Sequence, residues 1–277
     1  MKQAHSFPVP LGVGKKSSAR LAIEPTGRAV VFVHGFGGHA TGTWDRFSEL
    51  LPAEASCSGH DLFFYGYESL KQPAVQSAAE LREWLSGLLT QPMDTLIQSL
   101  TPGSPGQRGS SRYERVIIAA HSLGAVVVRR ALLDLARDET LLEPLGRVRL
   151  VLFAPAHMGG DIIQLASAAL GFLRLAVMAP ILKFSWPSLK DLEPGSQTLV
   201  QLQEHTSEAL ERSRSLGTST SHLVAELVIH GQKDRIVSQN QFCSDPPLTR
   251  FPGRGHLDVC KPQDGYLNPL KELVNRV

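Results

Sequence analysis

The sequence predicts an α/β fold in which helices cover both faces of a mostly parallel sheet. Short apolar runs rich in β-branched residues recur along the chain, as in strands that are buried on both faces. Segments with apolar residues at helical spacing alternate with these runs. Because such alternation builds a parallel sheet, we expect one α/β domain over residues 20–277, preceded by an irregular segment at residues 1–19.

The expected elements follow one another along the chain. The run RAVVFVH at residues 28–34 reads as a first buried strand, which Gly35 ends. Further strands are expected at residues 60–67, 112–121, 147–155 and 226–231. Helices are expected at residues 43–55, 74–90, 123–137 and 265–276. The stretch 101–112 is rich in Gly, Pro and Ser, so we expect a surface loop there.

A long insertion, residues 157–221, separates the fourth expected strand from the fifth. Its first part, residues 162–182, is nearly continuous apolar sequence. A membrane-spanning helix is one interpretation, because about 20 apolar residues can cross a bilayer. Gln164, Arg174 and Pro180 interrupt the segment, however, and it lies inside the strand pattern. We therefore expect a helical lid over an active site, with ordinary core helices as the alternative.

Composition and charge exclude some classes of protein. The net charge of +2 gives no electrostatic signature of a nucleic-acid-binding protein. Three cysteines are too few for a disulfide framework or a Cys-rich zinc site, and they fit a reducing compartment. The first 20 residues lack the apolar run of a secretory signal. We expect a cytoplasmic protein without a nucleic-acid partner.

Ser122 is the candidate nucleophile. It lies in Ala120-His121-Ser122-Leu123-Gly124, between a buried strand and a helix. That is the position of a nucleophile elbow, a tight turn that presents a serine hydroxyl. Ala120 stands where the common pattern has Gly. The alternative is that Ser122 only caps the helix, as serine often does.

Two backbone N–H groups are candidates for stabilising a negatively charged oxygen during attack on a carbonyl group. Leu123 supplies one at the start of the helix, where the helix dipole favours negative charge. The Gly-rich loop after the first strand supplies the other, with Phe36 as first candidate and Gly37 as second. Glycines allow that backbone to approach a substrate closely.

The acid and the base are expected later in the chain than the serine. Asp234 follows the fifth expected strand, at the edge of the sheet where functional residues gather in parallel folds. Asp161, after the fourth strand, is the rival acid. His256 lies in a Gly-rich loop near the C-terminus and can carry the serine proton. Asp258 is too close in sequence to be the obvious orienting acid.

Other chemistries have weaker support. His34, His39, His121 and His157 lack metal-ligand spacing, so we expect no metal and no cofactor. His34 and His121 are expected to shape the oxyanion loop and the elbow. A nucleophilic pair of Cys260 and His256 would leave the elbow at Ser122 unexplained, so Cys260 is expected to be a buried thiol.

Several strings resemble a known family in their order and spacing. They are VVFVHGFGG, AHSLGAVVVRRAL, FAPAHMGGDI, SLKDLEPGSQTLVQL, GQKDRIV and GHLDVCKP. Together they resemble the lipase-like serine esterases of the α/β-hydrolase superfamily, a group that includes the serine-active-site-containing protein and the glycosylphosphatidylinositol inositol-deacylase. The resemblance covers residues 28–277. It implies the α/β-hydrolase fold, the triad Ser122, Asp234 and His256, and a lid inserted after the fourth strand.

The expected function is hydrolysis of carboxylic esters with an apolar acyl chain, through an acyl-enzyme. Thioesters and amides are alternative substrates, since the same triad cleaves them. A catalytically silent lipid-binding protein on the same scaffold is an alternative of another class. The expected partner is a small-molecule or lipid-like ester, with transient contact between the lid and a membrane surface.

Overall fold

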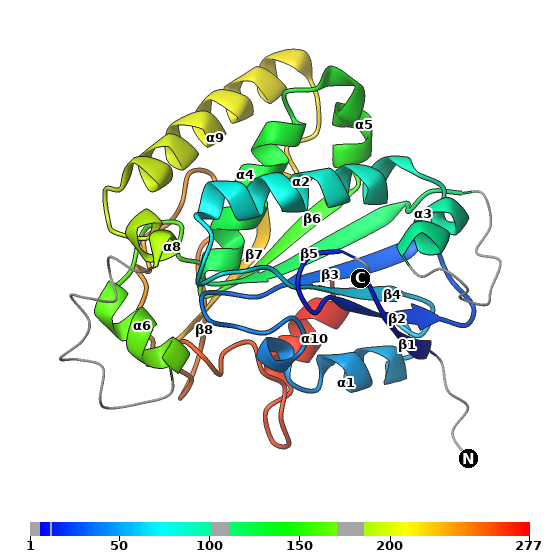
Figure 1. Ribbon diagram of the computed structural model, residues 1–277, viewed down its shortest axis with the longest axis horizontal. Coiled ribbons are helices and arrows are strands. Elements are labelled where there is room, and N and C mark those ends of the chain that lie inside the picture. The colour runs from blue at the N-terminus through cyan, green and yellow to red at the C-terminus, as the bar shows by residue number, and fades with distance from the viewer. Residues whose placement is uncertain (1–5, 12, 101–110, 171–185) are drawn as a thin grey trace.

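The protein is built around one eight-stranded sheet (Figure 1). The computed structural model describes residues 6–11, 13–100, 111–170 and 186–277. The strand order is β1-β2-β4-β3-β5-β6-β7-β8, and the strands from β4 to β8 in this order run parallel. The strands are β1 Ser6–Pro10, β2 Ser18–Ala22, β3 Arg28–Val33, β4 Asp61–Tyr65, β5 Arg115–His121, β6 Val148–Phe153, β7 Ala225–Gly231 and β8 Thr249–Phe251.

Helices lie on both faces of this sheet. The helix α4 (Leu123–Leu135) packs between α2 (Ala74–Thr90) and α9 (Gln197–Leu216) on one face, and α1 (Phe47–Ala53) and α10 (Asn268–Val274) contact each other on the opposite face (Figure 1). The remaining helices of the described residues are η1 Gly42–Trp44, α3 Met93–Leu100, η2 Glu139–Leu141, α5 Leu142–Leu145, α6 Ile162–Leu170 and α8 Pro187–Asp191. The expected α/β fold with a mostly parallel sheet is confirmed.

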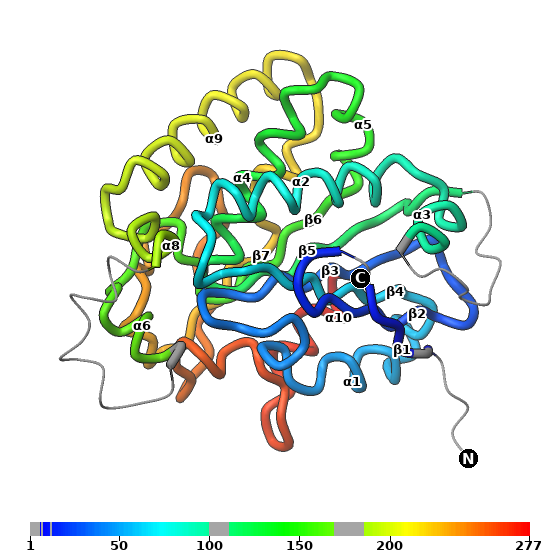
Figure 2. Tube along the Cα trace, viewed as in Figure 1, coloured from blue at the N-terminus to red at the C-terminus, as the bar shows by residue number. Residues whose placement is uncertain are grey.

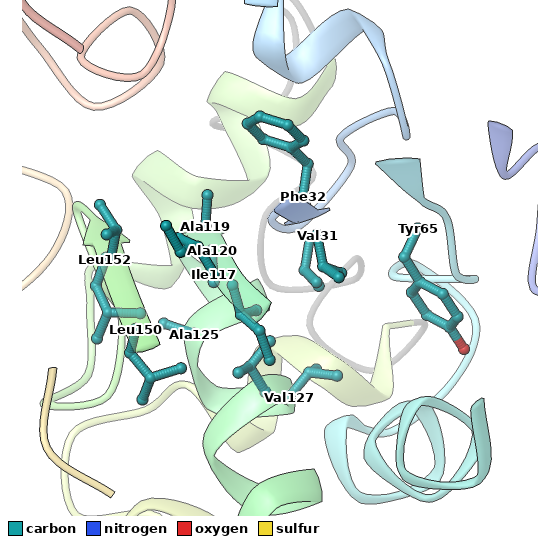
Figure 3. Packing of buried hydrophobic residues seen from close by; sticks show 14 of the residues in the cluster. Val31, Phe32, Tyr65, Ile117, Ala119, Ala120, Ala125, Val127, Leu150 and Leu152 are labelled. Carbon is teal, nitrogen blue, oxygen red and sulfur yellow. The ribbon is translucent and has the colours of Figure 1, made fainter. Parts of the chain in front are cut away.

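Buried apolar side chains pack together where β5 meets its neighbours. Figure 3 shows Ile117 of β5 close to Leu150 of β6 and Val127 of α4, all with at most 1% of their surface exposed. Interiors packed in this way resist displacement of either strand or helix. The junction between β5 and α4, which carries Ser122, is therefore held on both sides by the core.

The N-terminal segment departs from expectation. Residues 1–19 were expected to be irregular, but β1 pairs antiparallel with β2, and β2 pairs antiparallel with β4. The prediction is wrong for the described residues that form these strands. Pro8 and Pro10 concealed the strand, although proline is tolerated on an edge strand, where its missing N–H breaks no ladder. Figure 2 shows this blue segment beside β4.

The helix expected at residues 43–55 is broken into η1 and α1. Asp45 between them has a φ of 48°, in the left-handed region, and that conformation cannot continue a helix. The other expected helices begin and end within a few residues of α2, α4 and α10. Most of the expected surface loop, residues 101–110, lies outside the described residues.

The insertion at residues 157–221 contains α6, α8 and α9, and residues 171–185 within it lie outside the described ranges. Both α6 and α8 lie at the end of the sheet where the parallel strands finish (left in Figure 1). Within the described residues, every helix is too short or too polar to cross a bilayer.

Candidate active site

Ser122 lies in the turn between β5 and α4. Its backbone has a φ of 53° and a ψ of −121°, a strained conformation for a residue with a side chain. Such strain persists only where the surroundings fix it, and here two glycines allow close packing. A Cβ on Gly124 would come within 2.5 Å of the Val33 carbonyl oxygen, and one on Gly35 within 2.7 Å of Ser122 Cβ. The departure from the common pattern, Ala120, is accommodated as a fully buried residue of β5.

The structure brings Ser122, His256 and Asp234 together. The imidazole Nε2 of His256 lies 2.9 Å from Ser122 Oγ, and its Nδ1 lies 2.9 Å from Asp234 Oδ2. All three residues are at most 4% exposed. A carboxylate can only accept, so Nδ1 carries a proton, and Nε2 of the neutral ring is free to accept the serine proton. The arrangement has the connectivity of a Ser–His–Asp triad.

The carboxylate of Asp234 is fixed by its own loop. Its Oδ1 accepts hydrogen bonds from the backbone N–H of Ile236 at 2.9 Å and of Val237 at 3.4 Å. Burial acts to raise the pKa of Asp234, but the hydrogen bond from His256 and its charge, with the bond from Ile236, outweigh it, so the pKa lies below its ordinary value. Asp234 is therefore an anion when His256 is positioned for proton transfer.

The loops of the acid and the base are joined to each other. Lys233 N–H donates to the Arg254 carbonyl at 2.8 Å, and a Cβ on Gly231 would come within 2.8 Å of the Gly255 carbonyl oxygen. Asp258 accepts from Gly255 N–H at 2.7 Å and pairs with Arg254 at 3.3 Å. Asp258 thus shapes the loop that carries His256, whereas Asp234 contacts the imidazole itself.

One candidate oxyanion donor, Leu123, follows Ser122 in the chain, and the other, Phe36, follows Gly35, which packs against Ser122. Leu123 is the first residue of α4, and the first N–H groups of a helix have no partner within the helix. Gly37 N–H already donates to Ser69 Oγ at 3.0 Å, and Gly38 N–H to the Gly35 carbonyl at 3.1 Å. Among the hydrogen bonds of the described residues, Phe36 N–H has no acceptor. The contacts therefore favour Phe36 over Gly37.

The loop after β3 (residues 34–38) carries the candidate oxyanion donor Phe36. It is held by His34, which was expected to shape it, and by Tyr67 and Ser69, which the sequence did not single out. His34 Nδ1 donates to the Gly35 carbonyl at 2.8 Å, and the hydroxyl of Tyr67 donates to the His34 carbonyl at 2.9 Å. Tyr67 N–H donates to His34 Nε2 at 3.3 Å, and the two rings stack. Burial lowers the pKa of His34 to about 4. The signal that could have found Tyr67 and Ser69 is their position just after β4, at the same edge of the sheet.

The rival residues have other roles. Asp161 accepts from the N–H of Gln164 at 3.0 Å and from its side chain at 2.8 Å, which caps α6. Cys260 is buried, its Sγ faces the Thr43 carbonyl, and burial raises the pKa of its thiol to about 12. No group of three or more His, Cys, Asp or Glu side chains suited to a metal ion occurs in the part of the chain that the structure describes.

A serine on a strand–helix elbow, an acid after the strand β7 and a late histidine define the class of α/β hydrolases. The chain belongs to the alpha/beta hydrolase family, whose model matches residues 30–273. No curated protein matched the sequence.

Solved structures share the fold. Esterase B from Lactobacillus rhamnosis superposes with a TM-score of 0.55 at 13% identity, over 98% of this chain and 85% of that one. The mature lipase BlEst2 from Bacillus licheniformis gives a TM-score of 0.51 at 14% identity, over 99% of both chains. The hydrolase MGS-MChE2 from a lagoon-sediment metagenome gives 0.51 at 13% identity, over 97% of this chain and 99% of that one. At these identities the likeness concerns the fold alone.

Proposed function

We propose that the protein is a serine hydrolase that cleaves carboxylic esters through an acyl-enzyme. The observation that carries the proposal is the continuous hydrogen-bond chain from Ser122 Oγ through His256 to Asp234. A serine hydroxyl is a weak nucleophile unless a neighbouring base takes its proton, and this chain supplies that base. The similarity in fold to a lipase and an esterase supports the choice of esters.

In the first half of the reaction, Ser122 Oγ attacks the ester carbonyl carbon while His256 Nε2 takes the hydroxyl proton. Asp234 holds the ring in its Nδ1–H form and stabilises the imidazolium. The N–H groups of Phe36 and Leu123 donate to the oxyanion. The tetrahedral intermediate then collapses. The alcohol takes the proton from His256 and departs, and an acyl-serine remains on Ser122.

Water completes the cycle by the same steps. His256 takes a proton from water, the hydroxide attacks the acyl carbon, and the second intermediate returns Ser122 as leaving group. The proton on His256 goes back to the serine oxygen, and the carboxylic acid departs. No cofactor enters this scheme.

An apolar acyl chain fits the side chains near the oxyanion loop. Phe36 carries a proposed oxyanion donor, and its ring meets that of Trp186 edge-on, with centroids 5.5 Å apart. Trp186 precedes α8, in the insertion that we propose as a lid. A substrate held by Phe36 N–H would thus lie beside aromatic surface, where an acyl chain is better accommodated than a polar group.

The decisive experiment is labelling with a fluorophosphonate probe, followed by mapping of the modified residue. We expect Ser122 to be labelled and Ser122→Ala to lose both labelling and hydrolysis of p-nitrophenyl butyrate. Ser77→Ala is a matched control, because Ser77 is also buried, lies in α2, and has no hydrogen-bond partner for its hydroxyl among the described residues. If Ser122→Ala is labelled at the wild-type rate, Ser122 is not the nucleophile.

Substrate class requires a second experiment. Matched acetyl, butyryl, octanoyl and palmitoyl esters, each also prepared as the thioester and the anilide, separate acyl length from leaving group. We expect kcat/KM to be highest for an ester longer than acetyl. A preference for acetyl over every longer chain would contradict the apolar site, and a preference for the thioester or anilide series would change the reaction class.

A further inference from the structure

His121 immediately precedes the proposed nucleophile, yet the reaction scheme above does not use its side chain. The residue ends β5 and is 4% exposed. A polar ring buried this deeply needs a hydrogen-bond partner, because an unpaired polar group in the interior is costly. The identity of that partner indicates what the ring does.

The partner is the backbone of the proposed base. His121 Nε2 lies 2.8 Å from the carbonyl oxygen of His256. Since a carbonyl can only accept, His121 Nε2 carries the hydrogen and donates it. The two imidazole rings also contact each other, with centroids 4.9 Å apart and planes inclined at 47°. The side chain of His121 therefore contacts both the backbone and the ring of His256.

The opposite edge of the His121 ring faces the oxyanion loop. A Cβ placed on Gly35 would lie 3.0 Å from His121 Nδ1, closer than ordinary packing allows. His121 thus fills the space between Gly35 and the loop of His256. Its backbone continues directly into Ser122, so one residue touches all three parts of the site.

The charge state of His121 suits this position. Burial, together with the neighbouring charge of His256, lowers the pKa of His121 to about 3, against weaker opposing effects of its hydrogen bond and of Asp234. Lys261 also disfavours the charged form. The ring therefore stays neutral when His256 becomes an imidazolium, and it does not add a second positive charge beside it.

We propose that His121 is a positioning residue that holds His256 in register with Ser122 and the oxyanion loop. This inference rests on the proposed function, in which Ser122 passes its proton to His256. An error of about 1 Å in the placement of reacting groups can cost on the order of a hundredfold in rate. The donor on Nε2, rather than the ring as a whole, is the feature that the inference requires.

The test compares two substitutions that separate the aromatic ring of His121 from its hydrogen-bond donor. His121→Phe keeps an aromatic ring but removes the donor, whereas His121→Gln removes the ring but carries an amide N–H that can reach the same carbonyl. For p-nitrophenyl butyrate we expect His121→Phe to lower kcat at least tenfold, with KM changed by less than about twofold. His121→Gln should keep kcat within about threefold of wild type.

Two further measurements separate positioning from stability. Titration with the fluorophosphonate probe counts the sites that are folded and able to react, and its labelling rate constant should fall in parallel with kcat for His121→Phe only. In the wild type and His121→Gln, the far-downfield proton resonance of His256 Nδ1–H should be retained, and in His121→Phe it should shift or broaden.

Four outcomes decide the matter. Wild-type kcat in His121→Phe, or an equal loss in both variants, would overturn the role of the donor. If His121→Phe does not fold, an inactive but folded His121→Gln overturns it as well. If the wild-type protein neither reacts with the probe nor hydrolyses the ester, the proposed function fails, and the downfield resonance alone still reports whether His121 positions His256.

Discussion

Two aspartates compete for the role of orienting acid, and their hydrogen bonds distinguish them. Asp234 contacts His256 and two backbone N–H groups, whereas Asp161 caps α6. Asp234→Asn keeps the shape of the side chain but removes the charge and no longer enforces the productive tautomer of His256. We expect kcat for a short ester to fall by about 10⁴, as is typical when a triad aspartate is replaced by asparagine.

Asp161→Asn is the matched control for this substitution. Asparagine also accepts hydrogen bonds at the start of a helix, so we expect unchanged folding and a kcat within about threefold of wild type. A loss in Asp161→Asn as large as that in Asp234→Asn would show that the contacts in the structure do not identify the acid.

At the residue scale, the sequence identified the side chains that meet. Of the residues that hold them, it singled out His34 and His121 but not Tyr67 and Ser69. Ser122, Asp234 and His256 each follow a strand, in the chain order nucleophile, acid and base that the fold requires. The sequence pattern alone could therefore identify them. His121, Tyr67 and Ser69 act through single hydrogen bonds to backbone atoms far away in sequence. Such bonds depend on side-chain geometry, which no spacing of residues encodes.

At the element scale, the close approach of β3 to α4 depends on Gly124. We expect Gly124→Ala to destabilise the fold by about 1–3 kcal/mol, the usual cost of overpacking, because the new methyl group meets backbone oxygen rather than a movable side chain. Loss of probe labelling should accompany the destabilisation, since α4 carries the elbow. Urea unfolding and the labelling rate measure the two effects.

Gly87 provides the opposite case on α2. A Cβ there would lie 3.6 Å or more from its nearest neighbour, so Gly87→Ala meets no clash. We expect it to raise the free energy of unfolding by up to about 1 kcal/mol, because alanine is the better helix former. If Gly124→Ala and Gly87→Ala destabilise the protein equally, then Gly124 is not required for close packing at the elbow.

The short helix α8 connects three elements through Asp191. Its carboxylate accepts from Ala74 N–H at the start of α2 and from the hydroxyl of Thr198 in α9, both at 2.7 Å. We expect Asp191→Ala to lower the free energy of unfolding by about 2 kcal/mol, roughly 1 for each bond lost. Glu208→Ala, an exposed position of α9, should change it by less than about 0.5 kcal/mol. If Asp191→Ala and Glu208→Ala change the free energy of urea unfolding equally, Asp191 does not connect α8 to α2 and α9.

The elements that the sequence predicted best are those with strong internal signals. The strands β3 to β7 are apolar runs, and α2 repeats its apolar residues every three or four positions, so composition alone predicts them. The edge strands β1 and β8 depend on pairing with a neighbour in space. Asp45 interrupts a helix because of its backbone conformation, which its identity does not reveal.

At the scale of the whole molecule, the candidate site exists because strand order brings distant loops to one edge. The loops after β3, β5 and β7 follow the carboxyl ends of parallel strands, and the loop of His256 follows β8 at the end of the same sheet. A parallel α/β pattern therefore predicts that they converge, even without coordinates. The same pattern could not predict which histidines would be buried during that convergence.

That burial makes the stability of the protein depend on pH. Burial lowers the pKa of several histidines to about 3 or 4, so they stay neutral in the folded state, whereas the unfolded chain protonates them near pH 6.5. Between these values the unfolded state binds more protons, so the free energy of unfolding falls as pH falls. Four of these buried histidines are His34, His121, His222 and His230.

We expect the free energy of unfolding to fall on the order of 5 kcal/mol between pH 7.5 and 5.5, from about 1.4 kcal/mol for each histidine at pH 5.5. Urea titrations at pH 7.5, 6.5 and 5.5 measure this dependence. His222 is the position to substitute, because neither of its buried ring nitrogens has a hydrogen-bond partner among the described residues. His222→Leu should stabilise the protein at pH 5.5. It should also lower by about one the number of protons taken up on unfolding, which the slope of the free energy of unfolding against pH measures. A slope unchanged by this substitution would mean that His222 is protonated in the folded protein, which its burial argues against.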